Sequence, residues 1–158
     1  MASEANKAGV VITGAAGDMG AALADSFLAD GFTVFGADVV APPARAGFVP
    51  AVVDVTDRDS VFALADRAAA ESRLVVWVNC AGIFRQVSVS DAAQEDWDRI
   101  IAVNLTGTFN GCAAALDAMV GKVIGDTANK DVRHVVAVGT VYEEVLKAAK
   151  VTGADLIV

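Results

Sequence analysis

The sequence has few of the residues that build disulfide frameworks, metal centres or basic binding faces. It contains two cysteines, Cys80 and Cys112, and one histidine, His134, so we expect no metal site and two buried, unreactive thiols. Twelve Lys and Arg stand against 20 Asp and Glu, giving a net charge of −8. This balance argues against nucleic acid or an anionic membrane as a partner, because both attract basic faces.

Long apolar runs are also lacking. Charges and glycines interrupt the apolar segments before the roughly 18 residues that a membrane span needs. Residues 1–7 do not follow the basic-then-apolar pattern of a signal peptide, so we expect a cytoplasmic protein. What the 158 residues do have is a 55% hydrophobic content, which excludes a disordered chain and predicts one domain over 1–158.

Short apolar runs alternate with segments of helical period, which predicts an α/β fold, a three-layer, doubly wound parallel sheet. The expected strands are Val10–Thr13, Thr33–Ala37, Val49–Val53 and Leu74–Val78, in the order 3-2-1-4. Helices are expected from Asp18 to Gly31, from a Thr56/Asp59 capping pair to Glu71, and over Ala93–Val103 and Thr106–Val120. Pro50 places its strand at an edge, and the apolar run 74–78 predicts a central strand.

Residues 120–158 form a tail of different character. Strands are expected at 134–138 and 154–158, with a helix at 141–150 between them. We expect these two tail strands to extend the sheet beyond the fourth strand.

The strongest local signal is the run Thr13-Gly14-Ala15-Ala16-Gly17-Asp18-Met19-Gly20 between the first strand and its helix. Small residues let the backbone approach a diphosphate, and a helix N-terminus offers free N–H groups. The alternative is a tight turn without a ligand. The candidate cofactor-binding residues here are Gly14, Ala16, Asp18, Met19 and Gly20.

Asp38 ends the second strand, 24 residues after Gly14. Its carboxylate can accept hydrogen bonds from a ribose and would repel a 2′-phosphate, which favours NAD over NADP. Arg45, nearby in sequence, works against that preference. Two further turns follow strands at the same sheet edge and complete the predicted crevice: Asp54-Val55 and Asn79-Cys80-Ala81-Gly82. The candidate cofactor-binding residues in these turns are Asp54, Val55, Asn79, Ala81 and Gly82.

These motifs in this order resemble the first half of the short-chain dehydrogenase/reductase family, over residues 8–119. The glycine run is similar to that family's TGxxxGxG, with Asp18 in place of the middle glycine, and residues 79–82 are similar to its NNAG turn. The resemblance implies a Rossmann-like fold that binds NAD. Asn104 matches the asparagine that holds a water of the family's proton relay.

The family's catalytic Ser and Tyr-x-x-x-Lys are not matched. Tyr142 is the only tyrosine, and Lys147 follows it by five residues instead of four, about 100° further round a helix. Thr140 is too close to Tyr142 to replace the serine. Residues 132–158, with their strand–helix–strand pattern ending in Ala154-Asp155-Leu156-Ile157-Val158, resemble the universal stress protein family.

The hypothesis drawn from this mixture is an engineered chimera whose tail is grafted from another α/β family. Such a scaffold would bind NAD weakly at most and would have no turnover; a natural truncated dehydrogenase with a diverged tail is the alternative origin. The alternative functions are an NAD-dependent short-chain oxidoreductase using Tyr142 and Lys147, and an ATP-binding module like the stress proteins. We also expect a homodimer through helix 104–119, with Trp97 packed among helices or exposed at that interface.

Overall fold

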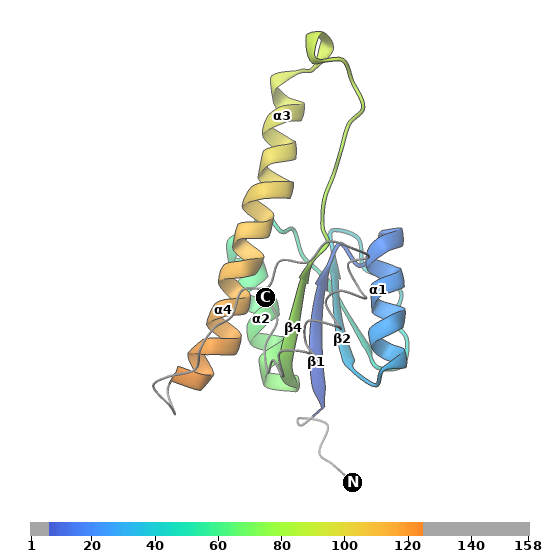
Figure 1. The fold of residues 1–158 in the computed structure, drawn as a ribbon, viewed down its shortest axis with the longest axis vertical. Helices are drawn as coiled ribbons and strands as arrows, with labels where there is room; N and C mark the ends of the chain where they lie inside the picture. The colour runs from blue at the N-terminus through green and yellow to red at the C-terminus, as the bar shows by residue number, and fades with distance from the viewer. Residues whose placement is uncertain (1–6, 125–158) are drawn as a thin grey trace, which may run out of the picture.

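A parallel four-stranded sheet forms the centre of the molecule, in a computed structural model that describes residues 7–124, with side chains to residue 119. The strands are β1 (Ala8–Thr13), β2 (Thr33–Asp38), β3 (Phe48–Val52) and β4 (Arg73–Asn79). They lie in the order β3-β2-β1-β4, which confirms the predicted fold class and strand order. Helix α1 (Asp18–Ala29) covers one face, and α2 (Arg58–Glu71) and α4 (Gly107–Ile124) cover the other (Figure 1).

The alternation of side chains along the strands explains the two helical layers. Val10 and Ile12 of β1 pack in the cluster under α1, whereas Val11 packs with Trp77 in the cluster under α2 and α4. All of these β1 side chains are fully buried. Strands covered on both faces read as continuous apolar runs, which is why the sequence shows them so clearly.

The two edges of the sheet differ from each other. β3 lies at one edge, as Pro50 predicted, and among residues 7–124 it pairs only with β2. β4 pairs with β1 within the part of the chain that the structure describes, so its predicted central position depends on the tail strands. Those strands, at 134–138 and 154–158, lie outside the described residues.

The N-terminus of α2 corrects the predicted capping pair. Asp57, not Thr56, caps the helix, and its carboxylate accepts a hydrogen bond from the Asp59 N–H at 3.2 Å. The Thr56 hydroxyl instead donates to Asp54 Oδ1 at 2.7 Å. The helix runs to Glu71, as predicted.

Two helices predicted as separate form one continuous arm. α3 (Gln94–Ile101) runs into the π-helical segment η3 (Ala102–Thr106) and from there into α4. In Figure 1 α3 projects well beyond the sheet, and the segment after β4, with the short helix η2 (Val89–Asp91), runs up beside it. Trp97 on α3 is 59% exposed, so the prediction that it packs among helices is wrong.

Among residues 7–124, none of the helices is long and apolar enough to cross a membrane.

Candidate functional site

The glycine run forms a tight loop between β1 and α1 whose backbone packs against the segment after β4. Gly14 has a φ of +70°, and a Cβ there would lie 2.7 Å from the backbone nitrogen of Ala81. A Cβ at Gly20 would overlap the carbonyl oxygen of Gly14. Glycine is therefore required at both positions for the loop to close. Gly17 differs, because a Cβ there would meet only the Gly14 oxygen, at an ordinary 3.5 Å.

Thr13 holds the ends of β1 and β4 together. Its buried hydroxyl accepts hydrogen bonds from the backbone N–H groups of Cys80 at 3.1 Å and Ala81 at 3.2 Å. Thr13 belongs to the glycine motif, but the motif alone predicted no role for it. The available signal was its position: a hydroxyl residue that ends a buried strand needs a hydrogen-bonding partner.

Asp38 joins the end of β2 to the same loop. Its Oδ2 accepts a hydrogen bond from the Ala16 N–H at 3.0 Å, and the Ala15 N–H donates to the carbonyl oxygen of Ala37 at 3.0 Å. Among the described residues, Oδ1 of Asp38 has no hydrogen-bonding partner. The structure thus brings the Asp38 carboxylate and the glycine loop together at one edge of the sheet.

The first turn of α1 lies open at this edge. Gly17 is the N-cap and has no side chain with which to cap, so the first N–H groups of α1 have no partner within the helix. Asp18 and Met19 of this turn are exposed. Asp18 does not cap the helix, although a carboxylate in the first turn is favoured by the helix dipole. An anion bound at the N-terminus of α1 would therefore lie near the negative charge of the Asp18 carboxylate.

Arg45 lies far from this edge. Its guanidinium pairs with Asp25 at 2.7 Å and stacks 4.6 Å from the centre of the Phe48 ring. Phe48 is the first residue of β3 and pairs with Val34, four residues before Asp38, or about 13 Å along the strand. The prediction that Arg45 affects the choice between NAD and NADP is wrong, because the fold places it toward the opposite end of the strands.

The turn after β3 lies next to Asp38. The Val53 N–H donates to the carbonyl oxygen of Asp38 at 2.9 Å, which brings the exposed Asp54 beside it. Val55 is buried, and its carbonyl oxygen accepts from the Asn110 side chain at 3.0 Å. Asp54 therefore lies at the same edge of the sheet as Asp38, while Val55 anchors the turn to α4.

Residues 79–82 at the end of β4 face two different parts of the molecule: the glycine loop and helix α4. Ala81 lies against the glycine loop, and the exposed Gly82 follows it. The Asn79 side chain belongs to another environment: its Oδ1 accepts from the Trp77 indole N–H at 3.0 Å, and its Nδ2 donates to Cys112 Sγ at 3.4 Å. Asn79 thus makes contacts toward α4, where Trp77 is buried.

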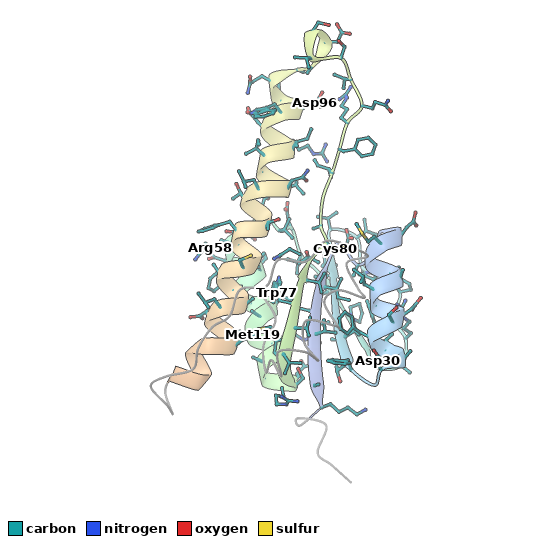
Figure 2. The ribbon with its side chains drawn as sticks, in the orientation of Figure 1. Asp30, Arg58, Trp77, Cys80, Asp96 and Met119 are labelled. Carbon is teal, nitrogen blue, oxygen red and sulfur yellow. The ribbon has the colours of Figure 1, made fainter. Side chains whose placement is uncertain are left out.

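Neither cysteine is fully buried, in contrast to the prediction. Cys80 and Cys112 are free thiols of intermediate exposure, and Figure 2 shows Cys80 at the end of β4. Partial burial raises the pKa of the Cys80 thiol, which favours the unreactive form. Within residues 7–124, no group of His, Cys, Asp and Glu is arranged to hold a metal ion.

Asn104 lies in the π-helical segment η3, and its side chain binds the backbone of Ile83, which follows the turn after β4. Its Oδ1 accepts from the Ile83 N–H and its Nδ2 donates to the Ile83 carbonyl oxygen, both at 2.8 Å. π-Helical turns occur often at functional sites. Four of the residues that the sequence analysis considered, His134, Thr140, Tyr142 and Lys147, lie outside the described residues.

Comparisons with known proteins agree with this geometry. The short chain dehydrogenase family matches residues 8–142. The chain is 36% identical over 118 residues to D-threitol dehydrogenase of Mycolicibacterium smegmatis (66% of this chain, 44% of that protein). It is 42% identical over 116 residues to trans-4-hydroxycyclohexanecarboxylate dehydrogenase of Sinomonas cyclohexanicum (73% and 42%). The ligand-free aldohexose dehydrogenase structure of Thermoplasma acidophilum superposes with a TM-score of 0.64 at 29% identity, over 75% of this chain and 47% of that one. The chain thus spans less than half the length of these relatives.

The family match overturns the chimera hypothesis. It runs to residue 142 and so crosses residue 119, beyond which the sequence analysis placed a tail from a different family. It also includes the strand expected at 134–138, where the stress-protein resemblance began. The interpretation of the chain as an engineered scaffold without turnover is wrong, and the expectation of at most weak NAD binding loses its basis.

Proposed function

From the premise that the chain belongs to the short-chain dehydrogenase family, we propose that it binds NAD for hydride transfer from a hydroxyl-bearing substrate. Members of the family typically bind NAD or NADP. A bound NAD would supply the acceptor for the hydride that leaves the alcohol carbon. The described residues are proposed to supply the crevice that holds and orients this cofactor.

The residues present fit a dinucleotide. Two glycines without room for a Cβ, Gly14 and Gly20, let the loop close beneath the uncapped first turn of α1. A diphosphate there would accept hydrogen bonds from the free N–H groups. Ala81 and Gly82 would form the opposite side, and the exposed Asp54 would border the adenine.

One contact carries the proposal: the hydrogen bond from the Ala16 N–H to Asp38 Oδ2. It holds the carboxylate at the glycine loop and leaves Oδ1 to accept from the hydroxyls of a ribose. The same negative charge would repel a 2′-phosphate, and Arg45 is too remote to compensate it. NAD is therefore proposed as the cofactor in preference to NADP.

The names of two relatives support a proposal for the substrate class. Those compared above are named for threitol and for a hydroxycyclohexane acid, both of which carry hydroxyl groups. We propose a secondary alcohol as the substrate of this chain as well. Tyr142, with Lys147 nearby in sequence, is the proposed proton acceptor, and Asn104 positions the chain at Ile83 beside the crevice.

Calorimetric titration of the chain with NAD and with NADP tests this proposal. We expect NAD to bind at least tenfold more tightly, or by about 1.4 kcal/mol. Asp38→Ala should weaken NAD binding by a similar factor, whereas Asp38→Asn keeps an acceptor for Ala16 and should mainly raise NADP affinity. Asp66→Ala, on the exposed face of α2, is the matched control.

The proposal is overturned if the chain melts cooperatively, which shows that it is folded, yet binds neither NAD nor NADP at millimolar concentration. If NAD binds, activity is assayed with secondary alcohols, and Tyr142→Phe should abolish it.

A homodimer through helix 104–119 is also proposed. Three large apolar side chains of this helix are exposed, Leu105, Phe109 and Leu116, and spacings of four and seven residues place them on one helix face. Light scattering after gel filtration should give the mass of a dimer, and Leu116→Glu should give a monomer. A monomer in the unmodified chain would contradict the proposal.

A further inference from the structure

A cleft of about 270 Å³ opens between α3 and the extended segment that follows β4. It is lined by Ile83, Phe84, Arg85, Asp96, Arg99 and Ile100. Figure 2 shows Asp96 on α3 in the projecting arm, with the extended segment beside it. The volume of this cleft lies just below the range typical of pockets for drug-sized ligands, so the cleft suits a smaller molecule.

The cleft borders the proposed cofactor crevice. Ile83 follows Gly82 directly in the chain and is held by both hydrogen bonds of the Asn104 side chain. A molecule in the cleft would therefore extend from the point where the turn after β4 ends. Such a molecule would lie next to a cofactor bound in the proposed crevice.

The charges in the cleft do not cancel. Arg85 Nη1 pairs with Asp96 Oδ1 at 2.7 Å, which neutralises one guanidinium. Arg99 lies one helical turn after Asp96 on the same face, and within the part of the chain that the structure describes it has no ion-pair partner. One positive charge is thus uncompensated in a chain whose net charge is −8.

The remaining walls are apolar. Ile83 and Ile100 are half-buried, and Phe84 is exposed beside them. An apolar wall next to a guanidinium that has no ion-pair partner among residues 7–124 matches a ligand with a hydrocarbon body and a carboxylate. Arginine binds carboxylates through two parallel hydrogen bonds, a geometry that also orients the ligand.

Resting on the proposed function, we propose that the substrate is a hydroxy acid whose carboxylate binds Arg99. In this arrangement Asp96 holds Arg85 in place as the second wall of the anion site, and Ile83 and Ile100 contact the hydrocarbon body. The hydroxyl group then points toward Asn104 and the crevice. Arg99 is a specificity-determining residue in this proposal, with no part in hydride transfer.

The test compares an acid with its neutral analogue. The full chain, with NAD and separately without it, is titrated calorimetrically with trans-4-hydroxycyclohexanecarboxylate and with the corresponding carboxamide. We expect the acid to bind at least tenfold more tightly than the amide. Arg99→Gln should remove this difference, and Arg99→Lys should restore part of it, because the charge returns without the paired hydrogen bonds.

The controls separate this inference from the cofactor proposal. Arg67→Gln removes another exposed guanidinium, on α2, where it pairs with Glu71, and should leave acid binding unchanged. NAD affinity, measured for every variant, should not change in Arg99→Gln. Failure to bind NAD counts against the cofactor proposal alone, since the titrations without NAD still report on the cleft. Equal binding of acid and amide, no binding of the acid, or unchanged acid binding in Arg99→Gln overturns the hydroxy-acid proposal.

Discussion

The hydroxyl of Thr13 accepts a hydrogen bond from the backbone N–H of Ala81, with 3.2 Å between oxygen and nitrogen. These residues are 68 positions apart in the chain: Thr13 ends β1, and Ala81 follows the end of the neighbouring strand β4. Because the same hydroxyl also accepts from the Cys80 N–H, one side chain positions two sides of the crevice. The geometry of the proposed cofactor site depends on this contact as much as on the glycines.

Thr13→Val should therefore destabilise the fold although it conserves shape. It leaves the Cys80 and Ala81 N–H groups without their acceptor, at a cost of about 2 kcal/mol. Urea denaturation measures this loss. Thr13→Ser keeps the oxygen and is the matched control; equal stabilities of the Val and Ser variants would contradict the assigned role.

Gly14 and Gly17 should respond very differently to alanine. Gly14→Ala combines a positive φ with a Cβ 2.7 Å from the Ala81 backbone. We therefore expect the free energy of unfolding to fall by about 2 to 4 kcal/mol and NAD binding to be lost. Gly17→Ala has room for its Cβ and should cost less than about 1 kcal/mol, the difference between the two residues at an N-cap. Thermal denaturation and NAD titration measure both effects, and equal losses would refute the loop geometry.

Asn104→Ala should loosen the segment after β4. Both hydrogen bonds to Ile83 disappear, so hydrogen exchange at the Ile83 amide should accelerate by about tenfold or more, which corresponds to about 1.4 kcal/mol of local stability. Thr106→Ala changes an exposed residue of the same π-helical segment and is the control. Exchange at Ile83 that is equally fast in the unmodified chain would show that the contact is not maintained in solution.

The cap of α2 should make stability depend on pH. The Ser60 hydroxyl, and then the backbone N–H groups of Ser60 and Asp59, donate to Asp57 and lower its pKa. A lowered folded-state pKa means that this stabilisation is complete above the ordinary carboxyl pKa of about 4 and is lost as the pH falls through the lowered value. The melting temperature of the unmodified chain should exceed that of Asp57→Ala near neutral pH, and the difference should shrink below about pH 4. A difference that stays constant in acid would contradict the assignment.

Much of the fold was predictable because its signals are local. Parallel strands buried on both faces appear as apolar runs, and Gly14, Gly20 and Asp38 occur at fixed positions relative to β1 and β2. The edge position of β3 followed from Pro50, whose missing N–H cannot join a ladder on both sides. The tail was misinterpreted because a short strand–helix–strand pattern is shared by many α/β families.

Other features depend on which distant residues meet. Arg45 is seven residues from Asp38 in the chain, yet the direction of β3 carries it toward the other end of the sheet. Asn79 follows the expected motif, but its side chain contacts Trp77 and Cys112 because it lies on the α4 side of β4. Neither placement can be obtained from spacing along the chain.

The order of strands and the position of the glycine loop were thus contained in hydrophobic pattern and turn chemistry, which act over a few residues. Only the tertiary structure shows three other features: the continuous α3–α4 arm, the hydrogen bonds of Asn104 to Ile83, and an Arg99 without an ion-pair partner among residues 7–124. The Asn104 contact joins residues 21 positions apart, and the energy of such a contact depends on side-chain direction and burial, which local pattern does not specify.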